Sequence, residues 1–326
     1  MNGISQVVWI MNRIMTVLGP YGANEIGYTS THEHLFAIAT SNRFDPDTEL
    51  DDLDTAIEEV LTFKESGGDT IVEVTTIDMG RDVTRLVTVS ICTGVKIIAA
   101  TGFYKGNYDP NGGKPAHKWS FLPEALDTAG IEPLAALFIH EIQEGIAGTG
   151  IKAGIIGEIG ISYRCMEEKE ERVLRAAGRA NRVTGAPISV HTTLGTMGRE
   201  VIGILCEEKA DLSRVVLCHL DLQSDVQYLV DLARQGVFLG FDTVGKKRYQ
   251  SDAKRVELIK ELVDRGFEEQ IVLASDVGRR SQLRCNGGQG YSYLLNCFLP
   301  RLEAAGLGSE TIRRFLVENP RRLLSF

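Results

Sequence analysis

The stretch Ile26-Gly-Tyr-Thr-Ser-Thr-His-Glu-His34 decides between the two common ways of building an α/β protein. It reads as a short buried strand that runs into the turn Ser30-Thr-His-Glu-His34. An open, doubly wound sheet would normally carry a glycine-rich phosphate-binding turn directly after its first strand. This turn carries two histidines and no glycine, which favours a closed barrel of parallel strands.

Seven more short apolar runs follow along the chain, so that eight strands are expected in all. None of the runs alternates strictly between apolar and polar residues, as expected of strands that are buried on both faces. The expected strands span residues 26–32, 70–75, 95–101, 154–157, 187–191, 215–219, 237–241 and 271–275.

Amphipathic segments lie between these strands and after the last one. Apolar side chains at helical spacing predict helices over residues 52–66, 167–184, 256–265 and 310–316, and glycines end the first two. Eight strand–helix units predict an α/β fold, a (β/α)8 TIM barrel with parallel strands, in a single domain over residues 1–326.

Composition and charge exclude several classes of partner. The chain of 326 residues is 43% hydrophobic and 24% charged, as is typical of a globular protein. A net charge of −9 argues against nucleic acid, because phosphate binding needs a basic surface. No apolar run is long enough to cross a bilayer, and the six cysteines stand singly. We therefore expect a cytoplasmic protein with reduced thiols and no membrane partner.

Side chains that can bind a metal lie at the carboxyl ends of five of the expected strands. They are His32, His34, Glu158, His191, His219 and Asp276. The carboxyl ends of all strands share one face of a barrel, and that face carries the active site. Because imidazole and carboxylate groups together suit zinc, manganese, iron or cobalt, we predict a site for divalent metal ions there.

The two carboxylates have further predicted roles. Glu158 offers two oxygens that can bridge two cations, although a helix cap or an ion pair is the alternative. Asp276 can bind one metal and also accept a proton from the attacking water, as the catalytic residue, with a helix N-cap as the alternative. His117, in the loop-like segment 107–118, and His140, in a helical run, have no such placement.

The ordered pattern of these residues resembles the phosphotriesterase family of the amidohydrolase superfamily. The pattern comprises His32-x-His34, Gly-Glu158-Ile-Gly, His191, His219 and Asp276. Phe-Asp-Thr-Val-Gly-Lys at 241–246 and Arg279-Arg280-Ser281 after Asp276 resemble its homology-protein and phosphotriesterase-related branches. The resemblance extends over nearly the whole chain and implies an amidohydrolase-type barrel.

The resemblance also implies how the ligands divide between two metal ions. His32, His34 and Asp276 would hold the more buried ion, and His191 and His219 the more exposed one. Many members bridge the ions with a carboxylated lysine, but strand four here carries Glu158, as in the homology-protein branch. The implied enzyme is a metal-dependent hydrolase, with zinc as the first choice of metal. A hydroxide that bridges the ions would attack a carbonyl or phosphoryl centre.

Basic residues after strands seven and eight suggest an anionic small-molecule substrate. Barrels of this class often bind phosphate there, and we predict substrate contacts for Lys246, Arg248, Arg279 and Arg280, with surface ion pairs as the alternative. Related lactonases act on phosphorylated sugar lactones, but that branch has an aromatic residue where this chain has Gln282.

Several functions remain open on the sequence alone. The first is hydrolysis of a small ester or lactone, which includes phosphorylated sugar lactones. The alternatives are an amidase for a small N-acylated compound, a promiscuous phosphotriesterase and a non-catalytic ligand-binding barrel. A complete set of six ligands argues against the last of these. Family members are often dimers, so the resemblance leaves room for a homodimer.

Overall fold

Eight parallel strands form the centre of the computed structural model, which describes residues 13–38, 46–105, 126 and 128–326. The strands pair with one another in chain order, so that each strand lies beside the next. They are β3 (Tyr28–Glu33), β6 (Gly68–Glu73), β7 (Lys96–Thr101), β8 (Ile155–Ile161), β9 (Ile188–Thr192), β10 (Val215–Cys218), β11 (Phe238–Phe241) and β12 (Ile271–Leu273).

The last strand returns to the first and makes the sheet a barrel. The Thr31 hydroxyl donates to the Leu273 carbonyl at 3.2 Å, and the Asp276 N–H donates to the His32 carbonyl at 3.1 Å. Each of the eight barrel strands overlaps the strand expected from the sequence, and the predicted fold class is confirmed.

Strand four differs from its expected form. The expected strand ends just before Glu158, but β8 continues to Ile161. Gly157 has φ 104°, a conformation that favours glycine, and the register with β9 shifts between Ile156 and Ile159. This bulge lets the strand continue. Glu158 therefore lies inside β8, and the prediction that it ends the strand is wrong.

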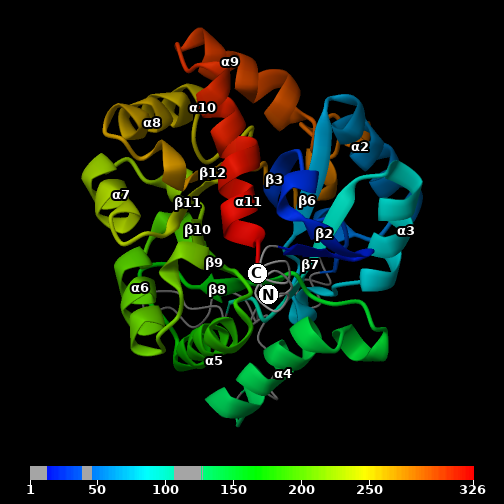
Figure 1. Ribbon diagram of the computed structural model, residues 1–326. Helices are drawn as coiled ribbons and strands as arrows, with labels where there is room; N and C mark the ends of the chain where they lie inside the picture. Colours follow the sequence, from blue (N-terminus) through cyan, green and yellow to red (C-terminus); the bar gives the residue numbers. More distant parts are fainter. Residues whose placement is uncertain (1–12, 39–45, 106–125, 127) are drawn as a thin grey trace, which may run out of the picture.

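Helices surround the strands as a ring (Figure 1). They are α2 (Leu53–Glu65), α3 (Val83–Thr93), α4 (Ile131–Gln143), α5 (Glu168–Thr184), α6 (Gly198–Glu207), α7 (Val226–Ala233), α8 (Asp252–Asp264), α9 (Leu299–Ala304), α10 (Ser309–Arg313) and α11 (Asn319–Leu324). Helix α8 begins before its expected start at residue 256, because the Ser251 side chain accepts the Lys254 N–H and caps the helix there.

The amino-terminal end of the barrel is closed by apolar side chains. The hairpin of β1 (Arg13–Thr16) and β2 (Gly19–Gly22) supplies Ile14, and α11 crosses the same end (Figure 1) with Leu323 and Leu324. These side chains pack against buried residues of the strands, among them Val72 and Phe238. The opposite end, where the carboxyl ends of the strands lie, carries the polar residues of the candidate site.

Three further predictions concern the loop-like segment, His140 and the lack of a membrane-spanning helix. The loop-like segment 107–118, with His117, lies outside the described residues, so its conformation stays a prediction. His140 is exposed on α4. Within the described ranges, each helix is too short or too polar to span a membrane.

Candidate metal centre

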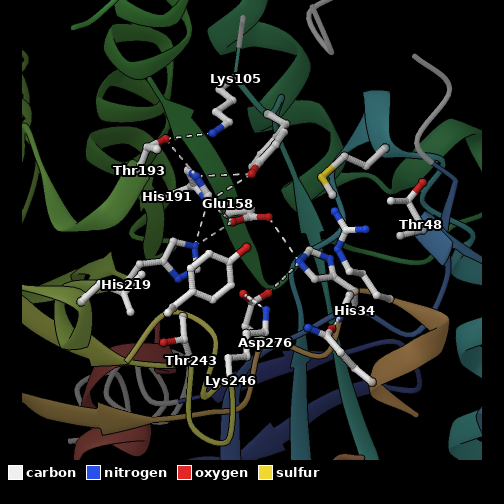
Figure 2. A pocket seen from close by; sticks show the side chains of 18 of the residues that line it. His34, Thr48, Lys105, Glu158, His191, Thr193, His219, Thr243, Lys246 and Asp276 are labelled. Carbon is white, nitrogen blue, oxygen red and sulfur yellow. Dashed lines mark hydrogen bonds and ion pairs between the residues drawn. The ribbon is translucent and has the colours of Figure 1, made fainter. Parts of the chain in front are cut away.

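Six side chains from five strands converge at the carboxyl ends of the barrel, and Figure 2 shows those that line the cavity. They are the six predicted ligands His32, His34, Glu158, His191, His219 and Asp276. Five of them line a cavity of about 440 Å³, and the sixth, His32, is buried beneath it. The cavity has the size of a small-molecule site.

One half of the cluster is built from β3, β8 and the segment after β12. His34 Nε2 lies 3.3 Å from Glu158 Oε1 and 3.5 Å from Asp276 Oδ1. His32 Nε2 lies 3.4 Å from Glu158 Oε2 and 3.7 Å from Asp276 Oδ1. Two histidines and two carboxylates therefore face one common point.

The other half of the cluster comes from β8, β9 and the residue after β10. His191 Nδ1 lies 3.0 Å from Glu158 Oε2 and 2.8 Å from His219 Nε2. His219 Nε2 is 3.8 Å from the same carboxylate oxygen. Glu158 thus stands between the two halves, in the position that a bridging carboxylate requires.

The donor atoms fit metal ligands better than they fit a hydrogen-bonded cluster. His32 Nε2 is buried and has no hydrogen-bond partner among the described residues, which is costly for a polar atom. Two tetrahedral zinc ligands with bonds of about 2.1 Å lie roughly 3.4 Å apart. The separations around His32 and His34 are close to that value, so the residues present suit a divalent cation.

Backbone conformation after two strands helps to aim the ligands. His219 has φ 62° and Asp276 has φ 49°, both in the left-handed region that residues with a Cβ rarely adopt. Such residues persist where the surroundings hold them and they often mark functional sites. Gly278 leaves room beside them, because a Cβ there would lie 3.2 Å from the His34 ring.

Buried polar partners orient three of the histidines through the ring nitrogen that faces away from the centre. His34 Nδ1 lies 2.9 Å from the Thr75 hydroxyl, and that hydroxyl donates to Glu73. His219 Nδ1 lies 2.8 Å from Asp242 Oδ1, and His32 Nδ1 lies 3.3 Å from the Cys218 sulfur. Partners of this kind fix the orientation of a metal-binding histidine and leave Nε2 for the metal.

Sequence reasoning missed these orienting partners. The sequence does contain a signal for Asp242. This residue directly follows the seventh barrel strand, β11, much as Asp276 follows the eighth, β12. Glu73 ends β6 and Thr75 follows it, at a strand for which the sequence predicts no metal ligand. Tyr104 follows β7. Its hydroxyl lies 3.3 Å from both ring nitrogens of His191 and it lines the cavity.

The carboxylates of the centre attract positive charge, which either protonated histidines or a bound cation supplies. Burial alone would lower the pKa of His34, but hydrogen bonds to Asp276 and Glu158 raise it to about 10. Burial would raise the pKa of Glu158, but the surrounding histidines, His32 first, hold it well below its usual range. Burial and the neighbouring His219 lower the pKa of His191 to about 3. His191 is therefore neutral, which is the form that binds a metal.

The four basic residues predicted to contact substrate separate into two pairs. Lys246 and Arg279 line the cavity, where the Lys246 ammonium donates to Asp276 Oδ2. Arg248 is exposed and is absent from the described lining of that cavity. Arg280 lines a different pocket and donates to an exposed carboxylate at 2.6 Å. Lys105, which the sequence did not single out, also lines the central cavity.

A parallel barrel that gathers four histidines and two carboxylates in and beneath one cavity defines a class, the metal-dependent hydrolases. Within that class the chain belongs to the phosphotriesterase family, whose sequence pattern it matches over residues 12–324. The predicted resemblance is confirmed.

Individual relatives cover nearly the whole chain. The phosphotriesterase homology protein of Escherichia coli is 36% identical over 294 residues, or 90% of this chain and 96% of that protein. Its crystal structure, complexed with phosphate in the active site, covers 92% of this chain and 99% of that one with a TM-score of 0.85. The N-acetyltaurine hydrolase of Xenopus tropicalis is 31% identical over 97% of this chain and 99% of that protein. A lactonase structure from Listeria monocytogenes has a TM-score of 0.89 and 31% identity, and the match covers 96% and 99% of the two chains.

Proposed function

We propose that this chain hydrolyses a small ester or lactone that carries an anionic group, and that it does so with two divalent metal ions. The proposed ligands are His32, His34, Glu158, His191, His219 and Asp276. The observation that carries the proposal is the position of Glu158, whose Oε1 faces His34 while its Oε2 faces His191. Zinc is the proposed metal, and manganese, cobalt and iron accept the same ligand types.

When bound, the two ions would polarise the oxygen of the scissile group and lower the pKa of a bound water. The chain itself would supply the proton acceptor at Asp276. Burial would raise the pKa of Asp276, but Lys246, whose ammonium donates to Oδ2, and His34 hold it below its usual range. Asp276 is therefore ionised at neutral pH and can accept the proton that the attacking water releases.

Positive charge in the cavity supports an anionic substrate. Lys105, Lys246 and Arg279 all line it, and an ammonium or a guanidinium is a strong donor to a phosphate or carboxylate oxygen. The bound phosphate in the Escherichia coli relative is a property of that protein and is consistent with this proposal. Arg248 and Arg280, which lie outside the cavity lining, have no part in the proposed contact.

An amidase is the second candidate, and a specific observation favours it. Relatives from Xenopus tropicalis and Rattus norvegicus that are 31% and 32% identical over 97% of this chain are named N-acetyltaurine hydrolase. Such a substrate is a small N-acylated anion, and it would suit the same positive cavity. Hydrolysis of neutral phosphotriesters would be a side activity of either enzyme.

A panel of four substrates separates these possibilities. The metal-loaded enzyme is given a neutral lactone, a phosphate-bearing lactone, N-acetyltaurine and a neutral phosphotriester, and kcat/KM is measured for each. We expect the highest kcat/KM on the phosphate-bearing lactone, and a loss of about 100-fold or more in Glu158→Gln. The highest value on N-acetyltaurine would establish the amidase instead. No turnover of any of the four would sink both candidates.

We propose that the whole chain forms a single barrel domain.

We also propose a reducing, cytoplasmic location. All six cysteines lie in the described ranges and none of them is paired in a disulfide. Free thiols of this number are typical of reducing compartments. Gel electrophoresis with and without reductant on protein from native cells tests the location, since disulfide-linked forms would contradict it.

A further inference from the structure

The basic residues of the central cavity differ in their partners. Lys246 donates to Asp276, a proposed metal ligand, and Arg279 lies 3.5 Å from the carboxylate of Asp47. Lys105 has no carboxylate within ion-pair distance among the described residues. Its ammonium donates to the Thr193 hydroxyl at 2.9 Å, which leaves two N–H groups for another acceptor.

A close backbone contact with β8 sets the position of Lys105. The residue follows β7, and its main chain passes directly over Gly160 of β8. A Cβ on Gly160 would lie 2.2 Å from the Lys105 nitrogen, so the close approach needs glycine there. The Thr193 hydroxyl that receives the ammonium is itself fixed, because it donates to the Ile161 carbonyl at 2.7 Å.

The location of Lys105 relative to the metal centre is also informative. Figure 2 shows Lys105 and Lys246 on opposite sides of Glu158 and Asp276. Lys105 stands on the side of His191, because both residues contact the hydroxyl of Thr193. The cavity therefore has two positive sides, and among the described residues the Lys105 ammonium is the one lining cation with no carboxylate within ion-pair distance.

We propose that Lys105 binds the anionic group of the substrate, on the His191 side of the metal centre. This inference rests on the proposed hydrolase function and refines it. The substrate class is a small ester, lactone or amide with a phosphate, carboxylate or sulfonate on that side of the scissile bond. A partly buried ammonium that no carboxylate contacts is costly in the free enzyme, and an anionic ligand in contact with it reduces that cost. Burial lowers the pKa of Lys105, and Glu158 and Glu170, which lie beyond ion-pair distance, offset this only in part.

Inorganic phosphate is the probe that tests the subsite without any assumption about turnover. Calorimetric titration of the metal-loaded enzyme compares the wild type with Lys105→Met and with Lys247→Met, an equal loss of charge at an exposed position in the loop after β11. We expect Lys105→Met to weaken phosphate binding by about tenfold or more and Lys247→Met by less than about threefold. Equal affinities in the two variants, or no phosphate binding by the wild type, would overturn the proposal.

Two further readouts distinguish a substrate-binding Lys105 from a structural one. A structural role through Thr193 would lower the melting temperature of Lys105→Met, whereas a binding role leaves it unchanged or raises it. In hydrolysis, the loss of kcat/KM in Lys105→Met should be confined to anionic substrates and be partly restored by Lys105→Arg. An equal loss on neutral substrates would contradict the proposal. Phosphate binding that depends on Lys105 in a protein that hydrolyses nothing would sink the proposed function and leave the subsite standing.

Discussion

A fully buried arginine joins the segments that carry part of the candidate metal centre. Arg255 on α8 donates through Nε to Asp221 at 2.5 Å and through Nη2 to the Thr243 hydroxyl at 2.7 Å. A third bond, from Nη1, reaches Asp252 at 3.0 Å. Asp221 lies two residues after His219, and Thr243 lines the cavity, so this cluster fixes the exits of β10 and β11.

Replacing Arg255 with Met should therefore cost much stability. Arg255 and Asp221 are both 0% exposed, and the substitution leaves a buried carboxylate without its cation. Breaking a pair of this kind costs about 3–5 kcal/mol of unfolding free energy. With an m-value of about 3 kcal/mol/M, the urea midpoint should fall by about 1 M or more.

The matched control lies at the end of the same helix. Arg265 pairs with Glu261, and their side chains are 42% and 40% exposed. Arg265→Met should cost less than about 1 kcal/mol, because an exposed pair is screened by solvent. Adding Asp221→Asn to Arg255→Met should recover stability, since it removes the unpaired charge. Equal urea midpoints for the two single variants would refute the reasoning.

Three other predictions follow from the site and its surroundings. Asp276→Asn should lower kcat by about 100-fold or more in a protein that still unfolds in one cooperative transition, and near-normal turnover would refute its role as proton acceptor. Asp242→Asn should weaken metal binding by about 10–100-fold in a chelator competition, and unchanged affinity would show that His219 does not need its partner. Burial raises the pKa of Asp78 from 3.8 to about 6, so the folded chain retains a proton and loses stability as pH rises between these values. Asp78→Asn should flatten that slope in urea unfolding, and the same slope in both proteins would contradict it.

The strands and the metal cluster could be predicted from the sequence because both follow from local patterns. Short apolar runs without alternation mark buried strands, and the side chain at a strand exit is fixed by the chain order alone. His32, His34 and His191 could therefore be assigned to one face of the barrel from their positions in the chain. The bulge at Gly157 could not, because it depends on how β8 pairs with its neighbours.

Substrate contacts were less predictable, because a charge in the sequence does not reveal its partner. Arg280 immediately follows Arg279, yet it turns away from the cavity and pairs with Asp51. Lys246 reaches the cavity but meets Asp276 there. Lys105 follows an unremarkable apolar strand, and only the fold reveals that its ammonium has no carboxylate partner among the described residues.

Metal content per chain tests the central claim most directly. Protein purified without chelators is subjected to elemental analysis in parallel with His191→Ala. We expect about two equivalents of zinc or another divalent transition metal per chain, and a clear loss in the variant. One equivalent that is unchanged in His191→Ala, or no metal even after reconstitution, would contradict a dinuclear centre bridged by Glu158.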